Sequence, residues 1–561
     1  MVILSLIFLA ACSGTGEPKA DTLIINAVVY TVDSANSMAE MVAIKDGKIL
    51  AVGSGTEIEK WKGENTKVID AGGQFLMPGF IEGHGHIHGL GASLINLDLM
   101  NVKNWEEAVQ MVKNAAAKAK PGDWIIGRGW HQEKWDHAPQ PNFIGYPYQQ
   151  SLDSVSPQNP VLLSHASGHS VYANSKAFEL AGVNKQTVSP DGGAIVKDGT
   201  GKLVGVLEEK AQNLIWEAYE KWESQIPEEE RKKRWQESIA LAEQECLKNG
   251  ITSFQDAGSS IQQVAWMKEL AEQGKLNVRH WLMVRESLNN LKENLKTFPT
   301  RDAGNGFLTV NAVKVSLDGA LGSYGAWLLE PYTDRKGWTG LNTFSIDTLK
   351  QIADLCWSND LQLCVHAIGD RANRETLDIY ADQNTKNKKA KDHRWRIEHA
   401  QHVNPADIPR FKQFGVIASM QSVHCTSDAP FVPKRLGDER SANGAYMWKA
   451  FLKEGVVVTN GTDVPVERID PFTCYYAAVT RKMADGKAFY PDQCMTREEA
   501  LYSYTMANAY AAFQEKEKGS IVPGKYADLV LLNTNLIKCK EEEIKQTKVV
   551  FTMVAGNIKY K

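Results

Sequence analysis

The stretch that decides the fold is "LMPGFIEGHGHIHGLG", residues 76–91. An apolar run ends here in three histidines at every second position, His84, His86 and His88. Side chains two residues apart lie on one face of an extended segment, so two of these imidazoles can bind one metal ion. A histidine-rich polar loop is the alternative interpretation of this stretch alone. The rest of the chain must supply further ligands.

The composition is that of a globular protein. The chain has 561 residues, of which 43% are hydrophobic and 23% charged, with a formal net charge of −4. This length suits one large domain with insertions, or two or three domains. Lysine and arginine form no stripe, so a nucleic-acid partner is not expected. The chain has eight cysteines, and seven of them follow Cys12. This odd, scattered set is not a disulfide framework.

The first twelve residues, "MVILSLIFLAAC", form an apolar run too short to span a bilayer. They resemble a signal segment, and "LAAC" at residues 9–12 resembles a bacterial lipobox. The resemblance implies that residues 1–20 are signal and tether, and that lipid attaches to Cys12. The protein would then lie in the bacterial cell envelope, outside the cytoplasm, and touch the membrane only through this lipid. The segment departs from the pattern in lacking an early Lys or Arg, and a buried N-terminal strand is the alternative.

Both ends of the chain contain short apolar runs separated by Gly and Asp turns, which predict β-strands. We therefore expect one small β-sandwich built from both termini, residues 21–75 and 515–561. The part between them, residues 76–514, alternates strand-like and helix-like segments, which indicates a parallel α/β sheet. Several of these strands carry His, Lys or Asp near the C-terminal end, where barrel enzymes place catalytic groups.

The fold predicted is therefore α/β, a (β/α)8 TIM-like barrel. A simple barrel needs about 250 residues over eight units. His84 and Lys314 are 230 positions apart (314 − 84), too many for the first and fourth strands of a simple barrel. We interpret the surplus, at about residues 95–230, as an insertion over the barrel mouth.

The polar residues at these predicted strand ends form one chemical set. Four imidazoles, one amine and one carboxylate suit one or two divalent ions of the zinc class. A free lysine would repel a cation, but addition of CO2 converts its amine into an anionic carbamate with two oxygens. The set is His84, His86, Lys314, His366, His399 and Asp463.

At this point the chain resembles a known family. "MPGFIEGHGH" is similar to the start of the amidohydrolase superfamily barrel. "HAIGDRA", "RIEHAQ" and "TNGTDVPVERIDPF" point to its amidohydrolase-3 branch, which includes N-substituted formamide deformylases. The resemblance extends from about residue 21 to the C-terminus. The ordered ligand set is far more specific than a lone H-x-H.

The resemblance implies a role for each residue of the set. His84 and His86 match the metal-binding H-x-H after the first strand. Lys314 matches the fourth-strand lysine that is carboxylated in binuclear members. Taken alone, this lysine would more often form a salt bridge at a strand end.

The remaining ligands match later strands of the family pattern. His366 and His399 match the histidines of strands five and six, and Asp463 matches the strand-eight aspartate, a metal ligand and general base. Taken singly, either histidine would more often be structural and the aspartate a helix cap. The branch often carries a "GH" near His169, where a substrate contact and a structural role are equally open.

The implied activity is metal-dependent hydrolysis of a non-peptide C–N bond, in an amide or cyclic amide, with zinc expected. Asp463 would take a proton from water and return it to the leaving amine. One alternative is a mononuclear deaminase, which typically lacks the carboxylated lysine. Another is a non-catalytic ligand-binding surface lipoprotein, which would be expected to lose ligands. The substrate, the number of metal ions and whether the chain forms a homo-oligomer stay open.

Overall fold

A computed structural model describes residues 18–132, 135–165, 170–190, 193–387 and 392–561. The chain forms two compact units. One comprises Met1–His86 together with Glu243–Lys561, and the other comprises Ile87–Ala242.

The first unit contains a nearly closed barrel of eight strands, in which each strand pairs in parallel with the next. Gly83 N donates to Asn460 O at 3.1 Å, which connects the segment after the last strand back to the first. The predicted TIM-like barrel is therefore confirmed. In order the strands are β8 (Phe80–Gly85), β17 (Ile251–Ser259), β18 (Arg279–Val284), β20 (Leu308–Ser316), β21 (Gln362–Ala367), β22 (Arg396–His399), β23 (Ile417–Ser419) and β24 (Val458–Thr459).

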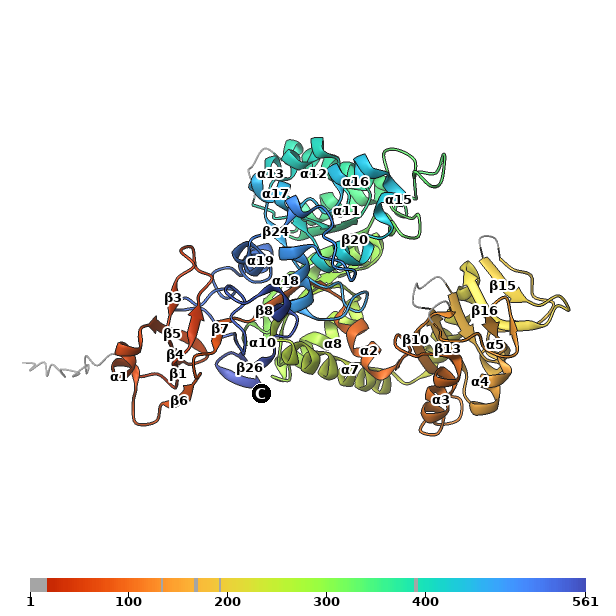
Figure 1. Cartoon of the computed structure of the whole chain (residues 1–561), viewed down its shortest axis with the longest axis horizontal. Coiled ribbons are helices and arrows are strands. Elements are labelled where there is room, and N and C mark those ends of the chain that lie inside the picture. The colour runs from red at the N-terminus through yellow and green to blue at the C-terminus, as the bar shows by residue number, and fades with distance from the viewer. Residues whose placement is uncertain (1–17, 133–134, 166–169, 191–192, 388–391) are drawn as a thin grey trace, which may run out of the picture. The chain divides into compact units, whose positions relative to one another are not determined.

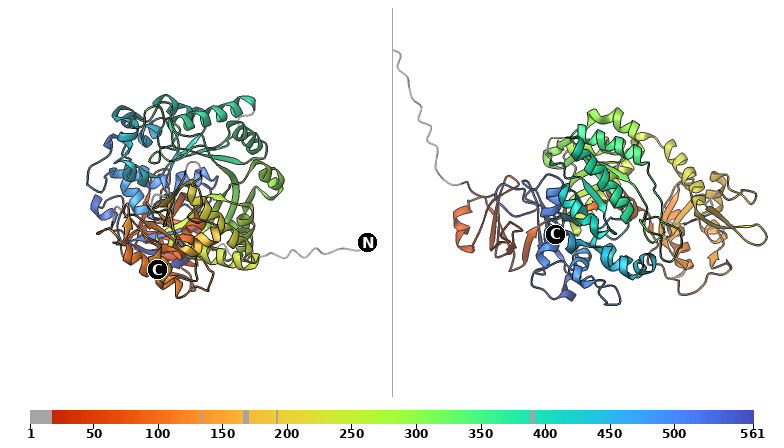
Figure 2. Two further views of the ribbon diagram at one scale, coloured as in Figure 1. Left: turned by 90° about the vertical axis from the view of Figure 1, so that its right-hand side faces the viewer. Right: turned by 90° about the horizontal axis from the view of Figure 1, so that it is seen from above.

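Helices follow the strands, as a parallel sheet requires of its crossover connections. In Figure 2 the helices coloured from green to blue lie around the strands. Side-chain caps mark several starts: Ser260 accepts from Gln263 N before α8, and Ser345 accepts from Thr348 N before α11. The main helices of this series are α8 (Ile261–Glu272), α11 (Ile346–Ser358), α12 (Asp370–Lys386), α13 (Ile408–Gln413), α14 (Ser422–Asp428), α17 (Trp448–Lys453) and α18 (Pro471–Thr480).

Both ends of the chain build two further sheets of the same unit (Figure 1). A four-stranded sheet has the order β5-β4-β1-β6, and a six-stranded sheet has the order β27-β26-β25-β7-β2-β3. Their shared core includes Ile24, Val42, Leu529 and Phe551. The strands are β1 (Thr22–Ile25), β2 (Val28–Tyr30), β3 (Met38–Ala39), β4 (Met41–Lys45), β5 (Lys48–Gly53), β6 (Lys67–Asp70), β7 (Phe75–Pro78), β25 (Leu529–Leu532), β26 (Val549–Val554) and β27 (Asn557–Tyr560).

The second unit contains the residues that we predicted to be surplus to the barrel. Its six-stranded sheet has its own core, with Trp105, Trp130 and Tyr172 fully or almost fully buried. The placement of this unit over the barrel mouth stays a prediction. In sheet order the strands are β15 (Gly193–Lys197), β16 (Leu203–Glu209), β14 (Ser170–Ala173), β13 (Val161–His165), β10 (Ile125–Trp130) and β9 (Leu97–Asp98), accompanied by α3 (Trp105–Ala116), α5 (Ser175–Ala181) and α6 (Asn213–Gln225).

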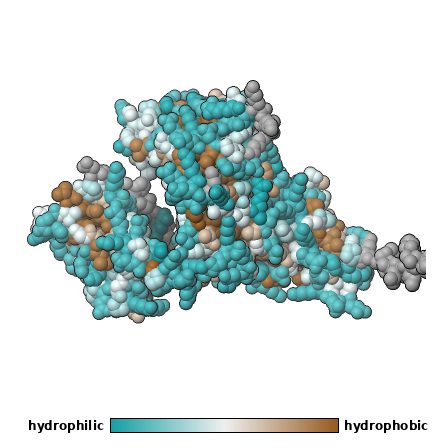
Figure 3. All heavy atoms as spheres, turned by 180° about the vertical axis from the view of Figure 1, so that it is seen from behind, coloured by the Kyte–Doolittle hydropathy of each residue, from teal (hydrophilic) through white to brown (hydrophobic). Residues whose placement is uncertain are grey.

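The face of the molecule in Figure 3 is mostly hydrophilic, with hydrophobic residues in separate small patches. Among the described residues, no helix has both the length and the apolar character needed to cross a membrane. Cys12 lies outside the described residues, so the lipobox interpretation stays a prediction.

Candidate metal centre

The six predicted ligands lie at or just beyond the C-terminal halves of barrel strands. His84 is in β8, Lys314 in β20 and His366 in β21, and His399 is the last residue of β22. Asp463 follows β24 by four residues. Because the strands are parallel, these side chains share one end of the barrel, which is where TIM barrels place their active sites.

A buried cluster of three side chains forms the centre of this end. His84, His399 and Asp463 each offer one ligand atom, and these atoms all lie within 4.8 Å of one another. Asp463 Oδ1 lies 3.6 Å from His84 Nε2, and Asp463 Oδ2 lies 4.0 Å from His399 Nδ1. His86 Nε2 lies 3.2 Å from Asp463 Oδ1, and its side chain is 33% exposed. His86 therefore marks the open side of the cluster.

The other two predicted ligands border this cluster. Lys314 Nζ lies 3.3 Å from His84 Nε2. The ring of His366 lies 4.4 Å from the ring of His399, and its Nε2 lies 3.4 Å from Asp318 Oδ1. The fold thus brings all six residues into one group, although they span almost 400 positions of the sequence (463 − 84 = 379).

The backbone at two of these residues is strained. His399 has a φ of 74° and Asp463 a φ of 60°, in the left-handed region that residues other than Gly rarely adopt. Such conformations cost about 1–3 kcal/mol each and cluster at functional sites. Gly461 allows the chain to pass close to β8 here, because a Cβ at this position would lie 2.6 Å from His84 N.

The buried imidazoles are neutral at neutral pH. Burial, followed by the positive charge of Lys314, lowers the pKa of His84 to about 4. Burial, with His366 and His84 close by, lowers the pKa of His399 well below its usual value. A neutral imidazole keeps a lone pair on one ring nitrogen, which is the form that binds metal.

The carboxylate and the amine have shifted pKa values too. Burial by itself would raise the pKa of Asp463, but His86, His84 and His399 hold it well below its usual value. Burial lowers the pKa of Lys314. The cluster therefore combines an ionised carboxylate with neutral imidazoles, the donor set of a zinc-class ion.

Within the part of the chain that the structure describes, two buried atoms of the six predicted ligands lack a hydrogen bond of acceptable geometry. They are Asp463 Oδ1 and His366 Nε2. Buried polar atoms in folded proteins are nearly always satisfied. A divalent cation among these donors would satisfy Asp463 Oδ1, so the residues present fit a metal ion.

Three polar side chains that our sequence analysis did not single out support the histidines. Glu398 Oε2 contacts His84 Nδ1. Gln421 Oε1 lies 2.8 Å from His399 Nδ1. Asp318 faces His366 and accepts backbone N–H groups of Ile368, Gly369 and Trp327 at 2.8–2.9 Å.

A fourth such side chain, Glu82, holds the loop of Asp463. It accepts hydrogen bonds from Thr462 N and from Tyr504 Oη. Burial raises the pKa of Glu82 to about 8 despite these hydrogen bonds. The available signal was an acidic residue inside an apolar strand, in "FIEGHG" and in "RIEH", because a buried acid requires a partner.

The histidines outside the predicted ligand set lie in different parts of the chain. His424 stacks on His399, with ring centres 6.3 Å apart and planes at 13°. His402 is buried and packs edge-on against Tyr446. His169 lies outside the described residues. The second unit contains His88, His131 and His165.

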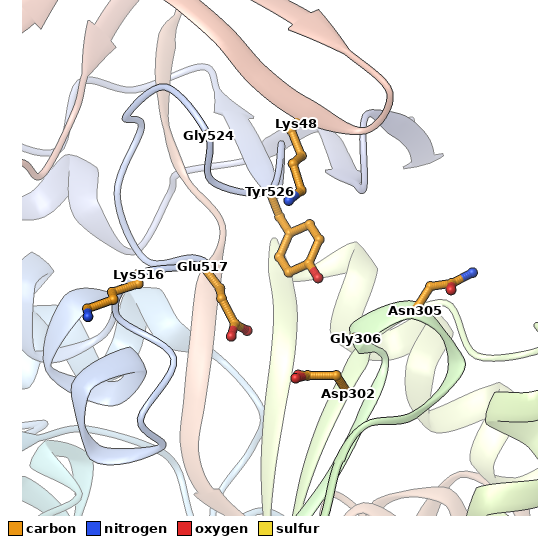
Figure 4. A pocket seen from close by; sticks show the side chains of 8 residues that line it. All are labelled: Lys48, Asp302, Asn305, Gly306, Lys516, Glu517, Gly524 and Tyr526. Atoms are coloured by element: carbon orange, nitrogen blue, oxygen red, sulfur yellow. The ribbon is translucent and has the colours of Figure 1, made fainter.

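A cavity of about 480 Å³ lies elsewhere in the first unit. Figure 4 shows its lining, in which Asp302, Glu517 and Tyr526 face a common space. Asp302 precedes β20, whereas Lys314 is six residues after the first residue of that strand. Six strand residues span about 20 Å. The cavity therefore lies toward the opposite end of the barrel, and none of the six ligands lines it.

Known proteins are similar in sequence to this chain over nearly its whole length. A family model described as "Amidohydrolase family" matches residues 67–560. "Protein LONG AFTER FAR-RED 3" of Arabidopsis thaliana is 32% identical over 528 residues, covering 92% of this chain and 88% of that protein. "Putative amidohydrolase YtcJ" of Bacillus subtilis (strain 168) is 28% identical, covering 95% and 98%. "N-substituted formamide deformylase" of Arthrobacter pascens is 26% identical, covering 96% and 98%.

Two solved structures share the fold at comparable identity. An uncharacterized metal-dependent hydrolase from Pyrococcus furiosus is 27% identical with a TM-score of 0.75, covering 92% of this chain and all of that one. An uncharacterized metal-dependent hydrolase from Pyrococcus horikoshii is 26% identical with a TM-score of 0.77, covering 93% and 99%.

Proposed function

The chain belongs to the amidohydrolase family and is a metal-dependent hydrolase; we propose that it cleaves a non-peptide carbon–nitrogen bond, in an amide or cyclic amide, with Asp463 as general base. The observation that carries the proposal is the buried cluster of Asp463 with His84 and His399 at one end of the barrel.

The proposed ligands are the six residues identified from the sequence, with zinc as the proposed ion. When bound, such an ion lowers the pKa of water to about 7 and polarises a carbonyl group. Two of the histidines also have a second polar partner, since Gln421 Oε1 lies 2.8 Å from His399 Nδ1 and Glu398 Oε2 contacts His84 Nδ1. Second partners of this kind fix the tautomer and direction of a metal-binding histidine.

Asp463 performs the proton transfers of the proposed reaction. Its carboxylate is ionised and can accept a proton from the attacking water, whose oxygen bonds to the carbonyl carbon. When the C–N bond breaks, the same carboxyl group gives the proton to the leaving nitrogen. The products are a carboxylic acid and an amine, and Asp463 returns to its ionised form.

Lys314 is proposed to be carboxylated. Addition of CO2 requires the unprotonated amine, and burial lowers the pKa of Lys314 in that direction. The new N–C bond releases a proton and leaves an anionic carbamate with two oxygens. Lys314 Nζ lies 3.3 Å from His84 Nε2, so a carbamate here would add its oxygens to the proposed ligand set. The presence of this lysine favours a binuclear hydrolase over the mononuclear deaminase, which typically lacks it.

The test combines metal analysis with a substrate panel. Purified protein would be assayed for bound metal by elemental analysis, and for amine release from N-substituted formamides, N-acyl amines and cyclic amides. Formamides are included because one relative is a formamide deformylase. We expect metal-dependent release from at least one class. A protein that contains no metal after growth and reconstitution with zinc would refute the proposal.

A further inference from the structure

A fully buried ion pair lies behind His84. Arg396 and Glu398 are both 0% exposed on β22. Glu398 Oε2 contacts His84 Nδ1, and Arg396 Nη2 donates to the same carboxylate oxygen at 3.0 Å. Arg396 Nε lies 2.6 Å from the other oxygen. The guanidinium therefore faces both oxygens of the acid that faces the histidine.

Arg396 is itself held from several directions. Its Nη2 donates to Gly83 O at 2.7 Å and to Ser419 Oγ at 2.7 Å. Its Nη1 donates to Gln255 Oε1 at 2.5 Å. These partners belong to β8, β23 and β17, so one side chain from β22 connects four barrel strands. Such a network leaves the carboxylate of Glu398 little freedom to move.

The contact with Glu398 determines which nitrogen of His84 carries the proton. A carboxylate that faces a permanently charged guanidinium can only accept, so His84 Nδ1 must be the donor. The neutral ring then keeps its lone pair on Nε2. That atom is the one near Lys314 and Asp463, at 3.3 and 3.6 Å.

We propose that Glu398, anchored by Arg396, is a positioning residue for the metal centre that fixes the tautomer of His84 and thereby sets the metal affinity. This inference rests on the proposed metal centre. Loss of such a partner typically weakens metal binding by about 10- to 100-fold. His399 offers a contrast within the same site, because a neutral amide, Gln421, orients it.

The test measures zinc affinity, which does not depend on the substrate. Zinc dissociation constants would be determined by chelator competition for wild type, Glu398→Gln and the control Glu243→Gln. Glu243 is matched because it is buried and also faces a histidine, His280, at 2.9 Å. We expect about 10- to 100-fold weaker zinc binding for Glu398→Gln, and a change within about twofold for the control.

Glu398→Gln leaves Arg396 buried without its carboxylate partner, which can prevent folding. A second variant tests the same role without this unpaired charge. The double variant Arg396→Gln/Glu398→Gln removes both charges together, and it should fold and still bind zinc about tenfold or more weakly. Circular dichroism reports folding of each variant. Imidazole nitrogen-15 spectra of the wild type, assigned with His84→Ala, should show the Nδ1–H tautomer of His84.

The outcomes distinguish failure of the proposed metal centre from failure of the positioning role of Glu398 alone. A wild type that binds no zinc overturns the metal centre and this inference with it. A wild type that binds zinc, with a folded Glu398 variant of unchanged affinity, overturns the positioning role alone. The Nε2–H tautomer of His84 in the wild type would also overturn it.

Discussion

Replacement of Asp463 by Asn is the sharpest test of the proposed chemistry. The substitution keeps the size of the side chain and one oxygen that can bind metal, but the amide cannot accept a proton from water. His84, His86 and His399 remain in place around it. We therefore expect the variant to fold and to retain most of its metal while losing the base.

The expected magnitude follows from the role that the structure supports. General base catalysis contributes about 10²- to 10⁴-fold, or about 2.7–5.5 kcal/mol of transition-state stabilisation. The pKa of Asp463 is held well below its usual value, so the carboxylate stays ionised as the pH falls toward about 4. Above that pH, protonation of Asp463 should therefore cause no decrease in wild-type kcat.

The assay is kcat across pH on the best substrate of the panel, with metal content measured in the same samples. Asp428→Asn is a control, since this half-buried carboxyl group of the same unit accepts a hydrogen bond from Tyr446. The control should change kcat by less than about threefold. An Asp463→Asn variant with metal bound and near wild-type kcat would remove Asp463 from proton transfer and leave it at most as a ligand.

Three further predictions address other parts of the chain. Lys314→Ala should bind less metal and lose activity, with partial rescue by short carboxylic acids; two retained metals and full activity would contradict the bridging carbamate. Cys12→Ala should abolish membrane association in cell fractionation, and equal recovery in the membrane fraction would exclude lipid anchoring at this residue. Burial lowers the pKa of His402 to about 3, so the unfolded chain binds more protons and stability should fall by about 1.4 kcal/mol per pH unit as pH drops from about 6.5 toward 3. Denaturant midpoints of His402→Leu should show a shallower decline over that window, and an unchanged slope would mean that His402 does not contribute.

The barrel could be predicted from the sequence because its signals are local. Apolar runs that end in His, Lys or Asp mark the buried strands, and the helices between them start at caps such as Ser260 and Ser345. The period-two spacing alone predicts that His84 and His86 lie on one face of an extended segment. The ordered ligand set could be identified because His84 and His86 stand at the end of one strand and the other four residues stand at or near the ends of four further strands.

The partners of those ligands could not be predicted in the same way. The contact of Glu398 with His84 joins residues 314 positions apart, and Arg396 reaches three other strands of the barrel. A buried acid in "RIEH" requires some partner, but strand pairing and side-chain packing decide which one. The sequence by itself thus determined the set of candidate ligands. Only the tertiary structure decided how they are oriented, because tautomer, burial and pKa depend on neighbours that distant segments supply.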